Sequence, residues 1–259
     1  MVRDTIKDKS YFDDFILKKN ELINKNINKY KNDLIKKDRI QSVINFTIGL
    51  YKNMLIAKYS RGDNMFSNSI ANDYNRTIDL IYDNWEENQG KFIYSEGKET
   101  IILNQYTLSM YLSTTEFLSL GILINEDNEK LKKLMDIIIK DNVKDSLLNF
   151  LMQYLDNNIP DVTKESYKKF FHINERLGRL KTIIKETDKN IAEKELKYFL
   201  ENEWYASFKG TPLYDLHNNR HNIYAGYWCF VAAAIVKIKS LDDSSFRDNK
   251  YYPKDMLNN

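Results

Sequence analysis

Apolar side chains recur at steps of three and four residues along almost the whole chain. These steps place side chains on one face of an α-helix, whereas a half-buried strand alternates at every second residue. No segment shows sustained alternation, so we predict an all-α fold, a multi-helix bundle with N-terminal and C-terminal subdomains packed together. The first apolar stripe consists of Phe12, Phe15, Ile16, Ile23, Ile27, Tyr30 and Leu34.

Turn-forming residues are scarce, which also disfavours β folds: the 259 residues include 8 glycines and 3 prolines. The polar run 125–128 is the best candidate for a domain boundary. We therefore expect one helical domain over residues 1–125 and a second over 126–259. Beyond the first stripe, helices are expected over about 40–59, 67–88, 100–123, 131–139, 143–155, 163–186, 191–204 and 222–239.

The charge balance excludes several functional classes. With 39 basic and 37 acidic side chains, the chain lacks the basic excess of a protein that wraps nucleic acid. A single cysteine excludes a disulfide framework and a Cys-rich zinc module. The longest apolar stretch, Ile223–Val236, is too short to span a bilayer. Because residues 1–10 are charged where a signal peptide needs an apolar run, we expect a cytoplasmic protein.

Two histidines are the main candidates for a metal site. His217 and His221 are four residues apart, so on a helix they would share a face. Zinc proteases with this spacing need Glu directly after the first His, and Asn218 stands there. Asp215 is the only local third ligand. We favour loop histidines and expect no metal or cofactor; a metal-dependent hydrolase that uses His217 and His221 is the less favoured alternative.

Two other short patterns indicate packing or chance. Pro160-Asp161 with Glu195-Leu196-Lys197 matches PD-(D/E)xK nucleases, in which the last two charges share one face of a strand. Here the surrounding period is helical and separates Glu195 from Lys197 by about 160°, so we interpret the match as chance. Cys229 lies in an aromatic run and is expected to be a small packing residue.

An acidic segment stands out from the nearly neutral chain. Residues 79–99 hold six carboxylates and two lysines, a local charge of −4. The solvated side of an amphipathic helix is one explanation. The other is a surface that docks into a basic groove on a partner. Its candidate binding residues are Asp79, Asp83, Glu86 and Glu87 on the expected third helix, with Glu96 and Glu99 beyond it.

The C-terminal part carries a recognisable pattern. It includes Tyr224-Ala225-Gly226-Tyr227-Trp228-Cys229-Phe230, and it continues through Leu241-Asp242-Asp243 to Tyr251-Tyr252-Pro253. Trp204-Tyr205 and His221 fit the same pattern. This part resembles the C-terminal domain of PoNi-type immunity proteins, and Arg3-Asp4 with Tyr11-Phe12 resembles the start of their N-terminal helical domain.

The resemblance implies a cytoplasmic, helical protein that binds and neutralises a PoNe-type DNase toxin, a PD-(D/E)xK-like nuclease used in competition between bacteria. It also implies that the chain is not an enzyme. We expect the motif residues to form a folding core, because they are mostly large apolar or small side chains. Toxin contacts should then lie on exposed helix faces. The chain is expected to be a monomer or weak homodimer, and a helical scaffold or regulatory protein-binding module is the alternative.

Overall fold

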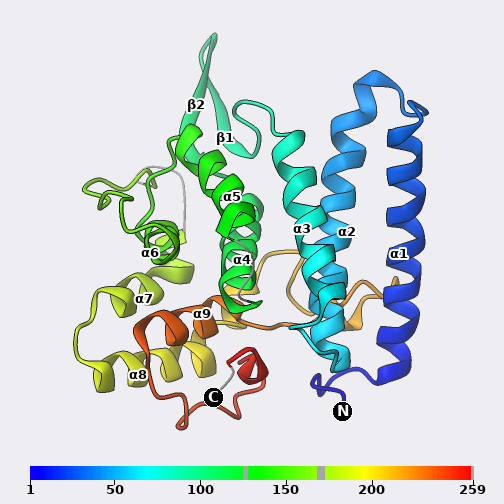
Figure 1. Cartoon of the computed structure of the whole chain (residues 1–259). Coiled ribbons are helices and arrows are strands. Elements are labelled where there is room, and N and C mark those ends of the chain that lie inside the picture. Colours follow the sequence, from blue (N-terminus) through cyan, green and yellow to red (C-terminus); the bar gives the residue numbers. More distant parts are fainter. Residues whose placement is uncertain (125–127, 168–172, 258–259) are drawn as a thin grey trace. The chain divides into compact units, whose positions relative to one another are not determined.

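The computed structural model describes residues 1–124, 128–167 and 173–257, and this part of the chain is mainly helical (Figure 1). The predicted fold class is therefore confirmed. The helices are α1 (Lys9–Lys31), α2 (Ile40–Arg61), α3 (Asn68–Asp83), α4 (Leu108–Ile124), α5 (Asn128–Lys140), α6 (Ser146–Leu155), α7 (Ile173–Lys185), α8 (Lys189–Tyr198) and α9 (Phe230–Lys239). The described residues also form one antiparallel hairpin, β1 (Lys91–Glu96) with β2 (Glu99–Tyr106).

The chain folds into two compact units, and each unit draws on two stretches of sequence. Unit 1 comprises Met1–Asn84 and Phe208–Trp228, and unit 2 comprises Trp85–Ser207 and Cys229–Asn259. The predicted boundary between residues 125 and 126 falls on Asn125–Asp127, which lie outside the described residues. That boundary stays a prediction.

In unit 1, α1 and α2 pack side by side (Figure 1). Asp8 caps the N-terminus of α1 by accepting a hydrogen bond from the Tyr11 amide. The buried stripe of α1 consists of Phe12, Phe15, Ile16 and Ile23. Gly62 ends α2 in the left-handed conformation, with φ of 101°, which favours glycine.

Helix α3 lies where the third helix was expected, but it is shorter than predicted. Ile70, Tyr74, Ile78 and Ile81 are buried, whereas the helix ends at Asp83 rather than near Asn88. The end is held by tertiary hydrogen bonds: the Tyr30 hydroxyl donates to Asn84 Oδ1 at 2.9 Å, and Gln41 Nε2 donates to the Asn84 carbonyl at 3.2 Å. These bonds replace the helical continuation that apolar spacing alone predicted.

The hairpin is a second difference from the predicted secondary structure, because residues 100–106 were expected to begin a helix. They form β2 instead, and α4 begins at Leu108. Gly97 has a φ of 64° in the two-residue connection between Glu96 and Glu99, the position at which a type II′ turn requires a positive φ. The β-branched run Thr100-Ile101-Ile102 then favours a strand over a helix.

The core of unit 2 contains α4 and α9, which pack against each other. Side chains of α4 from Phe117 to Ile124 are buried, and so are those of α9 from Phe230 to Val236. The small residues Ala232-Ala233-Ala234 allow close approach at this contact. The helix was expected to begin near Asn222, but residues 222–229 are non-helical, in keeping with the positive φ of 143° at Gly226.

The remaining helices of unit 2 largely match expectation. Those predicted over 131–139, 143–155 and 191–204 correspond to α5, α6 and α8. The one predicted over 163–186 is confirmed only as α7; residues 163–167 are non-helical, and residues 168–172 lie outside the described part of the chain. Within the described ranges, no helix has the length and apolarity required to cross a bilayer.

Candidate functional site

The acidic candidates do not form one helix face. Asp79 is half-buried and Asp83 is exposed on α3 of unit 1, where their i, i+4 spacing puts them on one side. Glu86 and Glu87 are exposed in the turn after the helix, in unit 2. The interpretation of four carboxylates on one helix is therefore wrong, because α3 ends before Glu86.

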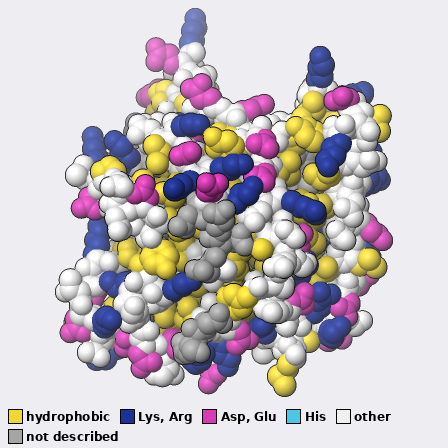
Figure 2. Space-filling view, in the orientation of Figure 1, with side chains coloured by type: hydrophobic (Ala, Val, Ile, Leu, Met, Phe, Trp, Pro, Cys, Tyr) yellow, Lys and Arg dark blue, Asp and Glu magenta, His cyan; other side chains and the backbone are white. Residues whose placement is uncertain are grey.

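Glu96 and Glu99 are brought together at the tip of the hairpin. They are exposed and are direct cross-strand partners. Like charges directly opposite each other destabilise a strand pair, so folding of the hairpin gains nothing from this arrangement. Figure 2 shows the hairpin projecting with a basic side chain at its end and acidic side chains beside it.

The hairpin also carries an exposed apolar pair that sequence reasoning missed. Ile93 and Ile102 are cross-strand partners, and they are 52% and 42% exposed. The aromatic rings of Phe92 and Tyr94, on alternate positions of β1, are half-buried, with ring centroids 6.5 Å apart. A signal was present, since aromatic and β-branched residues flank Gly97 on both sides.

The base of the hairpin is tied into unit 2. The fully buried Tyr106 donates from its hydroxyl to Asp141 Oδ2 at 2.7 Å and from its backbone amide to the Tyr167 hydroxyl at 3.2 Å. The Thr107 amide donates to the Gly90 carbonyl at 2.7 Å. Burial and the neighbouring Asp141 raise the pKa of Tyr106, so the phenol stays protonated and donates at physiological pH.

The first half of the family-like motif lies in unit 1 and packs on the end of α2. Trp228 Nε1 donates to Ser60 Oγ at 2.8 Å, and that hydroxyl donates to the Ala225 carbonyl at 2.6 Å. A Cβ added to Gly226 would lie 2.6 Å from Ser60 Oγ and from the Trp228 ring. Glycine is therefore required here for space as well as for its positive φ.

Tyr224 and Tyr227 are buried beside the same segment. The Tyr224 hydroxyl donates to Asp4 Oδ2 at 2.6 Å, and the Tyr11 hydroxyl donates to the Tyr224 carbonyl at 2.9 Å. The Tyr227 hydroxyl accepts from the His217 amide at 3.2 Å. These side chains connect the start of the chain to the motif, within unit 1.

The second half of the motif lies in unit 2. Asp243 accepts hydrogen bonds from Arg247 and from the Tyr252 hydroxyl at 3.2 Å, and both Asp243 and Tyr252 are buried. The rings of Tyr205 and Tyr251 stack with centroids 5.5 Å apart. Trp204 and Pro253 are also buried, whereas Asp242 is exposed and accepts from the Ser244 amide.

The candidate metal ligands are not gathered into a site. His217 Nδ1 lies 3.1 Å from the Tyr227 hydroxyl, and its Nε2 lies 3.6 Å from Asp215 Oδ1. His221 is exposed, and its Nε2 accepts from Arg220 instead. Among the residues that the structure describes, no group of three His, Cys, Asp or Glu side chains is arranged to hold a metal ion.

The nuclease-like pattern is helical, as predicted. Glu195 and Lys197 both lie on α8. Glu195 pairs with Arg179, and Lys197 lies 4.0 Å from Glu201. The two charges therefore have separate partners.

A buried ionic cluster supports the helices of unit 2. Asp145 caps α6 and accepts a hydrogen bond from the Tyr111 hydroxyl at 2.9 Å. Its Oδ2 lies 2.5 Å from Lys181 Nζ, which also lies 3.2 Å from Glu165. Burial raises the pKa of Asp145, and the ammonium of Lys181 opposes that rise. Sequence periodicity gave no indication of this cluster.

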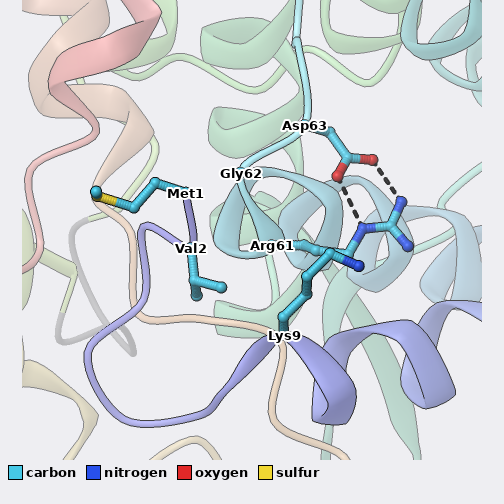
Figure 3. Close-up of a pocket in the computed structure, with 6 residues that line it drawn as sticks. All are labelled: Met1, Val2, Lys9, Arg61, Gly62 and Asp63. Carbon is cyan, nitrogen blue, oxygen red and sulfur yellow. Dashed lines mark hydrogen bonds and ion pairs between the residues drawn. The ribbon is translucent and has the colours of Figure 1, made fainter.

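A shallow pocket of about 340 Å³ lies in unit 1 (Figure 3). Its lining includes Met1, Val2 and Lys9 with the end of α2. Arg61 in its wall is paired with Asp63 and Asp13, and Lys9 also pairs with Asp13. Because Arg61 and Lys9 are already paired within the chain, these two side chains offer little free charge to an anionic ligand.

A protein-family model described as "PoNe immunity protein (PoNi), N-terminal" matches residues 3–136, and one described as "PoNe immunity proteins (PoNi), C-terminal" matches residues 143–256. The crystal structure of protein PA2201 from Pseudomonas aeruginosa is similar, with a TM-score of 0.69 and 15% identity, over 98% of this chain and 89% of that one. At that identity the likeness supports the fold alone. No curated protein matches the chain.

Proposed function

Because the chain belongs to the family of PoNe immunity proteins, we propose that it binds one cognate DNase toxin and neutralises it without catalysing a reaction. The observation that carries this proposal is the match of both family models, which together span residues 3–256 with a short gap. The toxin's target is DNA, so the immunity protein acts in the cytoplasm of the cell that it protects. The proposed partner is a PD-(D/E)xK-like nuclease domain.

The acidic segment supplies the chemistry for this binding. A nuclease cleft is basic because it must hold phosphates, and carboxylates on a partner can occupy it as phosphate mimics. Exposed acidic side chains also accelerate association with a basic partner, and salt weakens this effect. The proposed toxin-binding residues are Asp79, Asp83, Glu86, Glu87, Glu96 and Glu99.

Co-expression with the nuclease encoded beside its gene tests the function. We expect restored growth and a complex that survives co-purification. Continued killing by the active nuclease, with the immunity chain present in soluble form, would contradict the proposal and favour a scaffold that serves another partner.

A further inference from the structure

We propose that the β1–β2 hairpin is the element of this chain that enters the DNA-binding cleft of the toxin. The inference rests on the proposed function and names the part of the surface that performs it. The first support is the exposed apolar pair. Ile93 and Ile102 lie directly opposite each other, and both remain substantially exposed.

The neighbours of this pair make a contact face. Ser95 and Thr100 are cross-strand partners next to it, and both are exposed. An aliphatic centre with short polar side chains around it is typical of the middle of a protein interface, where the apolar anchors are desolvated and the rim stays polar. The other side of β1, with Phe92 and Tyr94, is half-buried. The Ile93–Ile102 side is therefore the more exposed one, and Glu96 and Glu99, one residue beyond Ser95 and Thr100, point to the other side of the hairpin.

The acidic side chains near the tip favour a partner with a basic surface. Glu96 and Glu99 stand opposite each other beyond the apolar pair, and their repulsion is relieved when a cationic surface approaches. A cleft that holds DNA offers basic side chains for the phosphates and apolar or aromatic surfaces for the bases. A cleft that surrounds the projection would meet both complements: the two carboxylates, which flank Lys98 in the turn, and the isoleucines behind them on the other side of the hairpin.

The base of the hairpin makes the projection suitable for docking. Tyr106 is locked by Asp141 and by the Tyr167 hydroxyl, and Trp85 contacts the Tyr106 ring edge-on with centroids 6.3 Å apart. Figure 1 shows the strands extending past the ends of α4 and α5, in the same unit. A rigid base reduces the conformational entropy lost when the tip binds.

Hydrogen exchange on the unmodified chain, alone and with the purified nuclease, tests the location without any substitution. We expect exchange of amides in residues 91–106 to slow in the complex. Unchanged exchange throughout this range, in a complex that forms, would overturn the inference.

Matched variants test the chemistry. Ile93→Thr/Ile102→Thr keeps β-branched side chains, so the hairpin should persist. We expect its complex with the nuclease to dissociate about ten-fold faster or more. The control is Ile139→Thr on α5, an isoleucine with the same exposed fraction of 52%, which should leave dissociation unchanged. Equal rates for the double variant and the unmodified chain would contradict the proposal.

A charge-reversal variant and its matched control test the acidic tip. Glu99→Lys should slow association at low salt and reduce its salt dependence. Glu21→Lys changes the net charge equally at an exposed position on α1 and should have a much smaller effect. Equal effects of the two charge reversals would mean that only the net charge of the chain matters. That result would overturn the inference that the hairpin tip contacts the nuclease.

The remaining outcomes separate this inference from the proposed function. If the nuclease and the unmodified chain form no complex, the proposed function fails. If they bind and the hairpin variants bind equally well, only the inference fails. If sedimentation shows that the unmodified chain dimerises and that Ile93→Thr/Ile102→Thr is a monomer with unchanged nuclease affinity, a second copy occupies the hairpin and the inference is wrong.

Discussion

The indole of Trp228 donates a hydrogen bond of 2.8 Å to the hydroxyl of Ser60, joining residues 168 positions apart in the sequence. Ser60 Oγ donates onward to the Ala225 carbonyl, and the Ser60 carbonyl accepts from the amides of Arg3 and Asp4. The Tyr59 ring meets the Trp228 ring edge-on at 4.9 Å. One turn at the end of α2 therefore fixes the motif segment and the start of the chain together.

Gly226→Ala should be strongly destabilising. Its Cβ would collide with Ser60 Oγ and with the Trp228 ring, at a positive φ of 143°. We expect the free energy of unfolding to fall by about 3 kcal/mol, as measured by urea denaturation followed by circular dichroism. Gly49→Ala is the control: Gly49 lies in α2, and a Cβ there would have open space. The control should gain up to about 1 kcal/mol. Equal effects of the two substitutions would refute this account.

Ser60→Ala removes the shared hydroxyl and leaves the buried Trp228 Nε1 without its acceptor. A buried donor without a partner costs about 1–3 kcal/mol, so we expect a loss in that range in the same denaturation experiment. Ser245→Ala, at an exposed position, should change stability by less than about 0.5 kcal/mol. Similar stabilities for the two variants would mean that the hydroxyl bridge contributes little.

Lys181→Met should destabilise the protein in a pH-dependent way. Burial raises the pKa of Asp145, so the folded state binds that proton more tightly than the unfolded chain does. Ionisation of Asp145 therefore lowers the free energy of unfolding as the pH rises. The loss begins near the pKa of the unfolded chain, about 3.9, and continues through the higher pKa of the folded protein. At neutral pH, Lys181 compensates this charge at 2.5 Å.

Without the ammonium, we expect a loss of about 3 kcal/mol at pH 7. The difference from the unmodified protein should shrink as pH falls and Asp145 takes up a proton. Lys197→Met, on the outer face of α8, serves as the control and should show only a small, pH-insensitive loss. A difference between Lys181→Met and the unmodified chain that stays constant from pH 7 to pH 4 would contradict the role of Asp145.

Cys229 should be unreactive in the folded protein. The side chain is 0% exposed, and burial raises the pKa of its thiol, so the reactive thiolate is scarce as well as inaccessible. A thiol-reactive disulfide reagent should release no colour from native protein at mildly alkaline pH and one equivalent after unfolding in denaturant. Rapid reaction before unfolding would show that α9 opens readily.

Helical spacing was sufficient to predict most helices, because α1, α3 and α6 each bury one stripe against a neighbour. It failed where tertiary contacts override propensity. Asn84 ends α3 through bonds to Tyr30 and Gln41, and residues 222–229 are non-helical, with the Ala225 carbonyl bonded to the Ser60 hydroxyl. The Asp145–Lys181 pair joins positions 36 residues apart. Local periodicity cannot predict a contact over that separation. The hairpin was foreseeable from the strand-forming residues around Gly97.

The most direct test of the account is a titration of purified nuclease with this chain while plasmid cleavage is followed. We expect cleavage to fall with added chain and to stop near equimolar amounts. We also expect Ile93→Thr/Ile102→Thr to shift this titration to higher concentration, whereas Ile139→Thr should not. Undiminished cleavage at a large molar excess of folded, unmodified chain would contradict the central claim that this protein neutralises the toxin by binding it.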